Sequence, residues 1–123
     1  MDAASLLRQE PAVAVSAAGV PSSAPLTGHE PKFNVYLYDG EHKEEDHYKA
    51  FTHFAHALDD VFIALVDDWN WQEVRNGTRR AFADLGFDVL WEKEVLTPTN
   101  FDGDWWNGSY LAIVAKPGAT SQL

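Results

Sequence analysis

Two short apolar runs, each followed by acidic residues, most constrain how this chain can fold. The first run is FNVYLY at residues 33–38, and Asp39 follows it. The second is VFIALV at residues 61–66, and Asp67 and Asp68 follow it. Unbroken apolar runs of this length are typical of strands buried on both faces. Residues 41–58 between them have apolar side chains at helical spacing. The pattern predicts a parallel strand-helix-strand unit.

The acidic residues would meet at one edge of the predicted sheet. Neighbouring parallel strands end side by side, and open α/β proteins bind ligands at this edge. Three converging carboxylates repel one another unless a proton or a cation holds them. The sequence therefore predicts a divalent-metal site, for Mg²⁺ or a similar cation, made by Asp39, Asp67 and Asp68. Structural alternatives remain for two of them, because Asp39 can form a turn and Asp68 can cap the next helix.

The remaining elements continue the α/β pattern. Residues 71–85 have helical spacing, and Gly86 is expected to end that helix. Residues 87–95 and 109–115 are expected to be strands. Since a loop without a helix joins them, they are predicted to pair antiparallel.

The chain divides into three parts by composition. Residues 1–31 are rich in Ala, Ser and Pro and are predicted to form a disordered tail. Residues 32–117 form the predicted α/β domain, and residues 118–123 a short C-terminal tail.

Composition and charge exclude several classes of function. A net charge of −10 argues against a protein that binds nucleic-acid phosphates. The chain has no cysteine, which excludes disulfides, thiolate zinc sites and a cysteine nucleophile. No apolar run approaches the roughly 20 residues that span a bilayer, and the N-terminal residues make a poor secretory signal. We therefore expect a cytoplasmic protein without a nucleic-acid or membrane partner.

The order of these elements, together with the acids, resembles the C-terminal half of a class I S-adenosylmethionine-dependent methyltransferase. The resemblance covers about residues 32–117. The segments YDGEH and VDDWNW are similar to those of metal-dependent O-methyltransferases of small molecules. The resemblance implies a partial Rossmann-like, three-layer αβα sheet that contains strands four to seven of that fold. Strand seven would run antiparallel, inserted beside strand five as a hairpin with strand six.

The resemblance also implies a reaction and roles for particular residues. Asp39, Asp67 and Asp68 would bind magnesium, and the metal would hold the hydroxyl of a small-molecule acceptor for methyl transfer. His42 would act as a general base or support a metal ligand, the alternative being a polar residue at a helix start. Trp69 is assigned to the wall of the cofactor or acceptor pocket, and Trp71 to the helix core.

One part of the family pattern is not found. The glycine-rich cofactor loop and the acid after strand two should precede residue 32, and neither is present there. We therefore expect an incomplete methyltransferase, which keeps the metal and acceptor half and pairs with a complementary N-terminal half or with a second copy. The first alternative is an inactive remnant that serves as a binding or assembly module. The second is another α/β domain with clustered acids, such as a phospho-acceptor domain or a different metal enzyme.

Two further groups of residues have open interpretations. His47, His53 and His56 are expected on a solvated helix face rather than around zinc, because no third ligand of clear geometry lies near them. Trp105, Trp106 and Asn107 precede the last strand and fit either an acceptor-shaping loop or a packing cluster of the hairpin.

Overall fold

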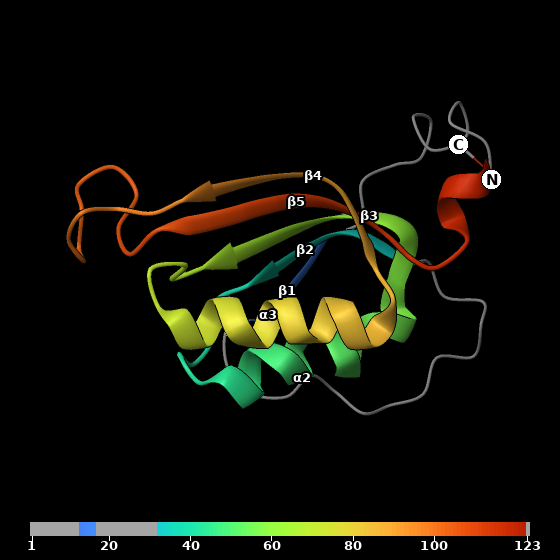
Figure 1. Cartoon of the computed structure of the whole chain (residues 1–123), viewed down its shortest axis with the longest axis horizontal. Coiled ribbons are helices and arrows are strands. Elements are labelled where there is room, and N and C mark those ends of the chain that lie inside the picture. Colours follow the sequence, from blue (N-terminus) through green and yellow to red (C-terminus); the bar gives the residue numbers. More distant parts are fainter. Residues whose placement is uncertain (1–12, 17–31, 123) are drawn as a thin grey trace.

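The computed structural model of the chain describes residues 13–16 and 32–122, which form a small α/β domain (Figure 1). The elements in chain order are β1 (Val13–Ser16), β2 (Phe33–Tyr38), α2 (Glu44–Phe54), the 3₁₀ turn η1 (Ala55–Ala57), β3 (Leu58–Asp67), α3 (Gln72–Leu85), β4 (Asp88–Val95), β5 (Ser109–Ala115) and the 3₁₀ turn η2 (Ala119–Gln122). No helix in these ranges is long and apolar enough to cross a membrane.

The strands form one mixed sheet in the order β1-β2-β3-β5-β4. β1, β2 and β3 are parallel, whereas β5 is antiparallel to both β3 and β4. The last strand therefore lies between the second apolar run and the strand that precedes it in the chain. This arrangement confirms the predicted α/β class and the predicted antiparallel insertion of the last strand.

Two boundaries differ from the prediction. The helix expected over residues 41–58 begins only at Glu44, and β3 begins at Leu58 instead of residue 61. Leu58 is fully buried and pairs with Phe33 of β2, so strand pairing at this position prevails over helical spacing. The second helix begins at Gln72, and Gly86 ends it in the left-handed conformation, as predicted.

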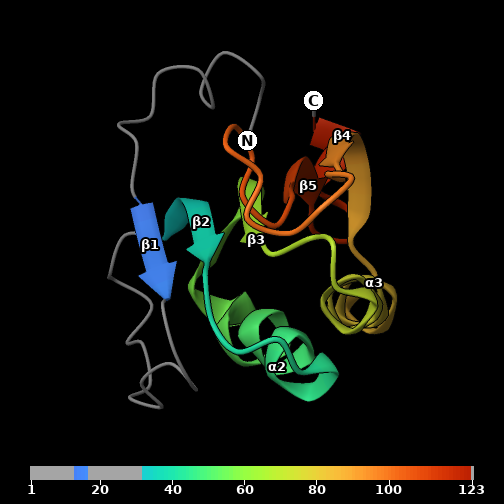
Figure 2. The same ribbon diagram turned by 90° about the vertical axis from the view of Figure 1, so that its left-hand side faces the viewer.

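Both helices cover the same face of the sheet, as Figures 1 and 2 show. The expected three-layer αβα arrangement is therefore wrong for the described residues, which form two layers. The reason is topological. The crossovers from β2 to β3 and from β3 to β4 advance across the sheet in the same direction, and right-handed crossovers that do so place their helices on one face.

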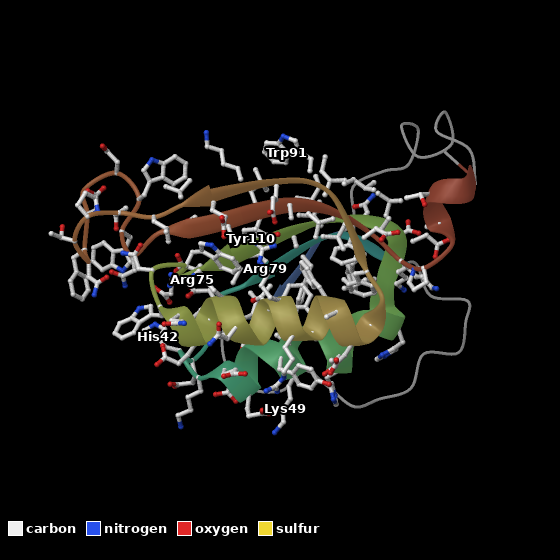
Figure 3. All side chains as sticks on the ribbon, in the orientation of Figure 1. His42, Lys49, Arg75, Arg79, Trp91 and Tyr110 are labelled. Atoms are coloured by element: carbon white, nitrogen blue, oxygen red, sulfur yellow. The ribbon has the colours of Figure 1, made fainter. Side chains whose placement is uncertain are left out.

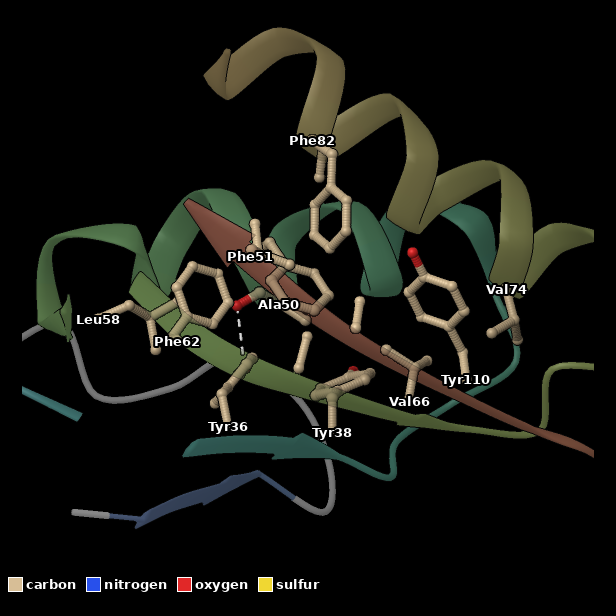
Figure 4. Packing of buried hydrophobic residues seen from close by; sticks show 14 of the residues in the cluster. Tyr36, Tyr38, Ala50, Phe51, Leu58, Phe62, Val66, Val74, Phe82 and Tyr110 are labelled. Carbon is tan, nitrogen blue, oxygen red and sulfur yellow. Dashed lines mark hydrogen bonds between the residues drawn. The ribbon is translucent and has the colours of Figure 1, made fainter. Parts of the chain in front are cut away.

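The core lies between this face and the two helices (Figure 4). The ring of Phe51 from α2 makes edge contacts with Tyr36 of β2 at 5.3 Å and with Phe82 of α3 at 4.9 Å between centroids. The Tyr36 hydroxyl donates a hydrogen bond of 2.9 Å to the carbonyl of Ala50. Aromatic packing thus joins both helices to the sheet.

The position of His47 corrects a prediction. It was expected on a solvated helix face, but its side chain is buried between α2 and the sheet, with an edge contact to the Tyr38 ring at 4.8 Å. The buried face of α2 comprises His47, Ala50 and Phe51. Helical spacing in the sequence instead predicts a buried stripe of Tyr48, Phe51, Ala55 and Leu58. Burial lowers the pKa of His47 to about 4, so the ring is neutral at physiological pH.

The predicted division into tails and domain stays a prediction. Within residues 1–31, the structure describes residues 13–16, whose backbone forms β1 and pairs with β2. The other residues of that segment lie outside the described part of the chain. At the C-terminus, η2 forms a short turn of helix within the predicted tail.

Candidate metal centre at the edge of the sheet

The three predicted acidic residues meet at the carboxyl edge of the sheet. Asp39 follows β2, Asp67 is the last residue of β3, and Asp68 comes next. One carboxylate oxygen from each of them lies within 4.8 Å of the others. Asp39 is exposed, Asp67 is half-buried and Asp68 is buried. The predicted convergence is therefore observed, and binding of a cation stays a prediction.

Asp68 is the most firmly held of the three. Its Oδ2 lies 2.8 Å from Nε2 of His42, and its Oδ1 accepts a hydrogen bond of 3.0 Å from Nδ2 of Asn107. Its backbone has a φ of 61°, a left-handed conformation that Asp tolerates better than most residues. Asp68 does not cap α3, because the N-cap residue is Trp71 and no side chain caps the helix. These contacts orient the carboxylate toward the site.

Asp67 carries the electrostatic cost of this arrangement. Burial, together with the negative charges of Asp68 and Asp39, raises the pKa of Asp67 to about 6, although the backbone amide of Asp68 acts in the opposite direction. Above pH 6, Asp67 is therefore ionised beside two other carboxyl groups, and the backbone amide of Asp68 offsets only part of the electrostatic repulsion. A cation bound at this point would relieve the repulsion.

His42 lies beside the cluster and is partly exposed, with its ring stacked on Trp71 at 4.8 Å and an interplanar angle of 14°. Through its contact with Asp68 it is placed to orient a carboxylate of the site. Its predicted role as a general base stays a prediction.

The structure reverses the locations expected for the two tryptophans. Trp69 is fully buried on the helix side, where it stacks on Tyr110 at 4.1 Å and donates a hydrogen bond of 3.0 Å to Glu94. Trp71 is 37% exposed beside His42. Strand alternation would have placed Trp69 on the other side, but the left-handed residue Asp68 turns the chain and directs the indole into the core.

Two hollows open next to the acids, on the side of the sheet away from the helices. The first, of about 270 Å³, is lined by Leu37, Asp39, Leu65, Val66, Asp67, Ser109 and Tyr110. The second, of about 160 Å³, adjoins it and is lined by Leu65, Lys93, Val95, Trp105, Ser109, Tyr110 and Leu111. A small organic ligand in these hollows would have apolar walls and an acidic edge.

The loop between β4 and β5 lies at the same edge, since β4 and β3 run in the same direction. Trp106 packs edge-on against Phe101 at 4.9 Å, while Trp105 lines the second hollow. Each interpretation therefore fits one residue of the pair: Trp106 belongs to a packing cluster with Phe101, and Trp105 lines the second hollow.

Two asparagines, Asn70 and Asn107, attach this loop to the acidic edge. Asn107 donates to Asp68, and Asn70 accepts from the backbone of Thr97 at 2.9 Å and donates to its hydroxyl at 2.7 Å. Gly108 follows with a φ of 86°, and a Cβ there would lie 2.7 Å from the side-chain oxygen of Asn70. The glycine next to Asn107 was the sequence signal for this close approach.

Comparisons of the chain with protein-family models, with curated proteins and with solved structures find no match.

Proposed function

We propose that this α/β domain binds a divalent cation through Asp39, Asp67 and Asp68, at the mouth of the 270 Å³ hollow. The observation that carries the proposal is the convergence of three carboxylates within 4.8 Å around a residue whose pKa is raised to about 6. Such an arrangement is unfavourable unless a ligand compensates the charge.

The donor set favours a hard cation. Carboxylate oxygens are the ligands that Ca²⁺ and Mg²⁺ prefer, whereas zinc sites use nitrogen and sulfur. Opposite ligands of Ca²⁺ lie about 4.8 Å apart, and those of Mg²⁺ about 4.2 Å apart. Small rotations of the exposed Asp39 side chain would bring the cluster to either geometry. The exposed side of Asp39 leaves coordination positions for water or a bound ligand.

The finer proposal is that the cation serves a metal-dependent O-methyltransferase. The strand order β2-β3-β5-β4 and the acids after β2 and β3 support it, because the resemblance implies the same order and positions. A bound cation would favour the deprotonated form of an acceptor hydroxyl. Of the protein's own residues, His42 and Asn107 orient Asp68, and Leu37 and Leu65 supply an apolar wall.

The described residues do not fit S-adenosylmethionine, because they contain no turn of closely spaced glycines at a strand end. The cofactor half of a methyltransferase would therefore have to come from a complementary N-terminal half. The alternative function, a binding or assembly module, is favoured by the face of the sheet that the two described helices leave uncovered (Figure 2). A phospho-acceptor site is less favoured, because Lys93 lines the second hollow and not the one that contains Asp39 and Asp67.

The test is calorimetric titration of Mg²⁺ and Ca²⁺ into the purified chain at pH 7.5. The Asp67→Asn variant should lose at least tenfold in affinity, because it removes one of the three ligand charges. The matched control is Asp104→Asn, an exposed acid of the β4–β5 loop outside the cluster, which should bind as the unsubstituted chain does. Equal affinity in the two variants, or no binding by the unsubstituted chain, would overturn the proposal.

A titration of S-adenosylmethionine in the same buffer tests the finer proposal separately. We expect no binding by this chain alone, even when the cation binds. Binding that survives the Asp67→Asn substitution would show that the cofactor site lies within the chain and would contradict the assignment of that site to another half.

A further inference from the structure

The face of the sheet away from the helices carries two complete rows of side chains that are set by strand register. Across β2, β3, β5 and β4, the first row is Val35, Ile63, Ile113 and Trp91, and the second is Leu37, Leu65, Leu111 and Lys93. Seven of these eight residues are apolar. We call this surface the open face.

The open face is accessible over its centre, while its neighbours in the same strands are buried. Ile63 is 38% exposed between Phe62 at 1% and Ala64 at 0%, and Ile113 is 37% exposed between Ala112 and Val114, both at 0%. Trp91 is 47% exposed and points away from the helices in Figure 3. Contiguous exposed apolar surface of this kind marks an interaction site more often than chance.

The topology explains why the two described helices leave this face uncovered. Each crossover moves the chain one way across the sheet, so each helix lies on the other face. A further crossover in the same direction would again lie on the helix side. The described helices and crossovers therefore leave the open face accessible.

The charges of the open face fit a second copy of the same chain. Lys93 is the one charged residue in the two rows, and Asp39 and Asp67 stand at the carboxyl end of the same face. The remaining acidic residues that give the chain its charge of −10 do not lie in these rows. If two copies pack face to face about a two-fold axis that runs along the strands, Lys93 of each lies opposite the acidic edge of the other.

The area sets the expected strength of such a contact. Four strands spaced about 4.8 Å apart and about six residues long give roughly 400 Å² per copy. A pair would bury about 800 Å², which is below the roughly 1,000 Å² of stable specific interfaces and in the range of weak, transient contacts. A contact of this small size favours a weak dimer, and we expect it to dissociate within the micromolar concentration range.

We propose that the open face is the interface of a homodimer, in which two sheets pack face to face about a two-fold axis near Ile63 and Ile113. The interface is isologous, so residues near the axis meet their own copies. The apolar contact does not involve the cation, whereas the charge contact of Lys93 uses the same Asp39 and Asp67 carboxylates as the proposed cation site.

Sedimentation velocity over a range of about 5 to 500 µM protein tests the proposal. The unsubstituted chain should shift from the 13.7 kDa mass of one copy toward twice that mass as the concentration rises. Ile113→Lys and Trp91→Lys should each weaken association at least tenfold. The matched control is Phe101→Lys in the β4–β5 loop, where Phe101 is 68% exposed and lies outside the open face; it should associate normally. Circular dichroism spectra of the variants verify that each one folds.

The absence of cysteine permits a second, positional test. In an I113C variant, a short bis-maleimide cross-linker should link two copies in high yield at concentrations where the dimer forms, because packed sheets lie about 10 Å apart, whereas F101C should not be linked. A chain that stays monomeric at 500 µM would overturn the proposal. So would a dimer that Ile113→Lys and Trp91→Lys leave intact, or one that links through F101C in preference to I113C.

Discussion

The two faces of the sheet are made by alternate residues of the same strands, yet they differ in packing and in charge. On the helix face, Phe62, Ala64 and Val66 of β3 are at most 1% exposed. On the open face, Ile63 of the same strand is 38% exposed. The helix face also buries the neutral side chain of His47, whereas the open face ends in ionisable Asp67.

The difference shows how stability and function divide within this small domain. The helix face contains the aromatic core, and its polar groups serve the fold. The open face contributes little to that core but carries the acidic edge, both hollows and the apolar rows. Substitutions on the two faces should therefore separate effects on stability from effects on binding.

The largest contrast is expected between neighbouring residues of β3. Phe62→Ala should lower the free energy of unfolding by about 3–5 kcal/mol, because it leaves a cavity in the core. Ile63→Ala should cost about 1 kcal/mol or less, because its side chain is already partly in water. Denaturant unfolding at low protein concentration, where any dimer is dissociated, measures both values. Equal losses would show that the open face is covered in the monomer.

Opposite pH dependences of stability are expected from the two faces. The folded pKa of His47, about 4, lies below its usual value of 6.5, so folding weakens proton binding there. The contribution of His47 to the free energy of unfolding is complete above pH 6.5 and is lost as the pH falls through 4, a change of about 3 kcal/mol. The folded pKa of Asp67, about 6, lies above its usual value of 3.8, so its contribution is largest at low pH. That contribution is lost as the pH rises through 6, by about 1–3 kcal/mol after allowance for solvent screening.

Single substitutions should reveal how each of the two groups makes the free energy of unfolding change with pH. Between pH 4 and 6.5, His47→Leu should become less stable as the pH rises, because Asp67 remains. Asp67→Asn should become more stable as the pH rises, because His47 remains. His56→Leu, an exposed histidine beyond the end of α2, serves as the control and should follow the unsubstituted chain. Thermal unfolding in a series of metal-free buffers measures the slopes. Parallel slopes in the two variants would contradict the assignment of these groups.

The smallest expected effect concerns the polar contacts that join α3 to β4 on the helix face. Arg79 donates to Glu92 at 2.6 Å and to Glu94 at 3.1 Å, and its guanidinium lies over the Tyr110 ring at 5.1 Å. Arg79→Lys keeps the charge but loses the two-pronged geometry, so we expect a loss of about 0.5–1 kcal/mol. The effect should shrink in 1 M salt. A loss above 2 kcal/mol in urea unfolding would mean that the contact is part of the core.

The sequence predicted the features that follow from strand periodicity. The two apolar runs became adjacent parallel strands, the last strand was inserted antiparallel, and Asp39, Asp67 and Asp68 met at one edge. These outcomes depend on alternation and on the way that parallel strands end, which local sequence encodes.

The errors arise where one residue changes the direction of the backbone or where two elements compete. The left-handed conformation of Asp68 sends Trp69 into the core, and periodicity along the strand does not contain that turn. His47 is buried because the packing of α2 against α3 and the sheet sets the rotation of the helix. The layer count depended on the direction of successive crossovers, which the order of elements alone does not specify.

The hydrogen bond from Asn107 to Asp68 has a mechanical consequence. It ties the aromatic loop between β4 and β5 to a residue of the acidic cluster, and Asn70 ties the other end of the loop to the same turn through Thr97. The positions of the loop and of the acidic cluster are therefore coupled through these hydrogen bonds. Any ligand that pushes the loop outward takes a donor away from Asp68, and any change in the charge of Asp68 alters how firmly the loop is held.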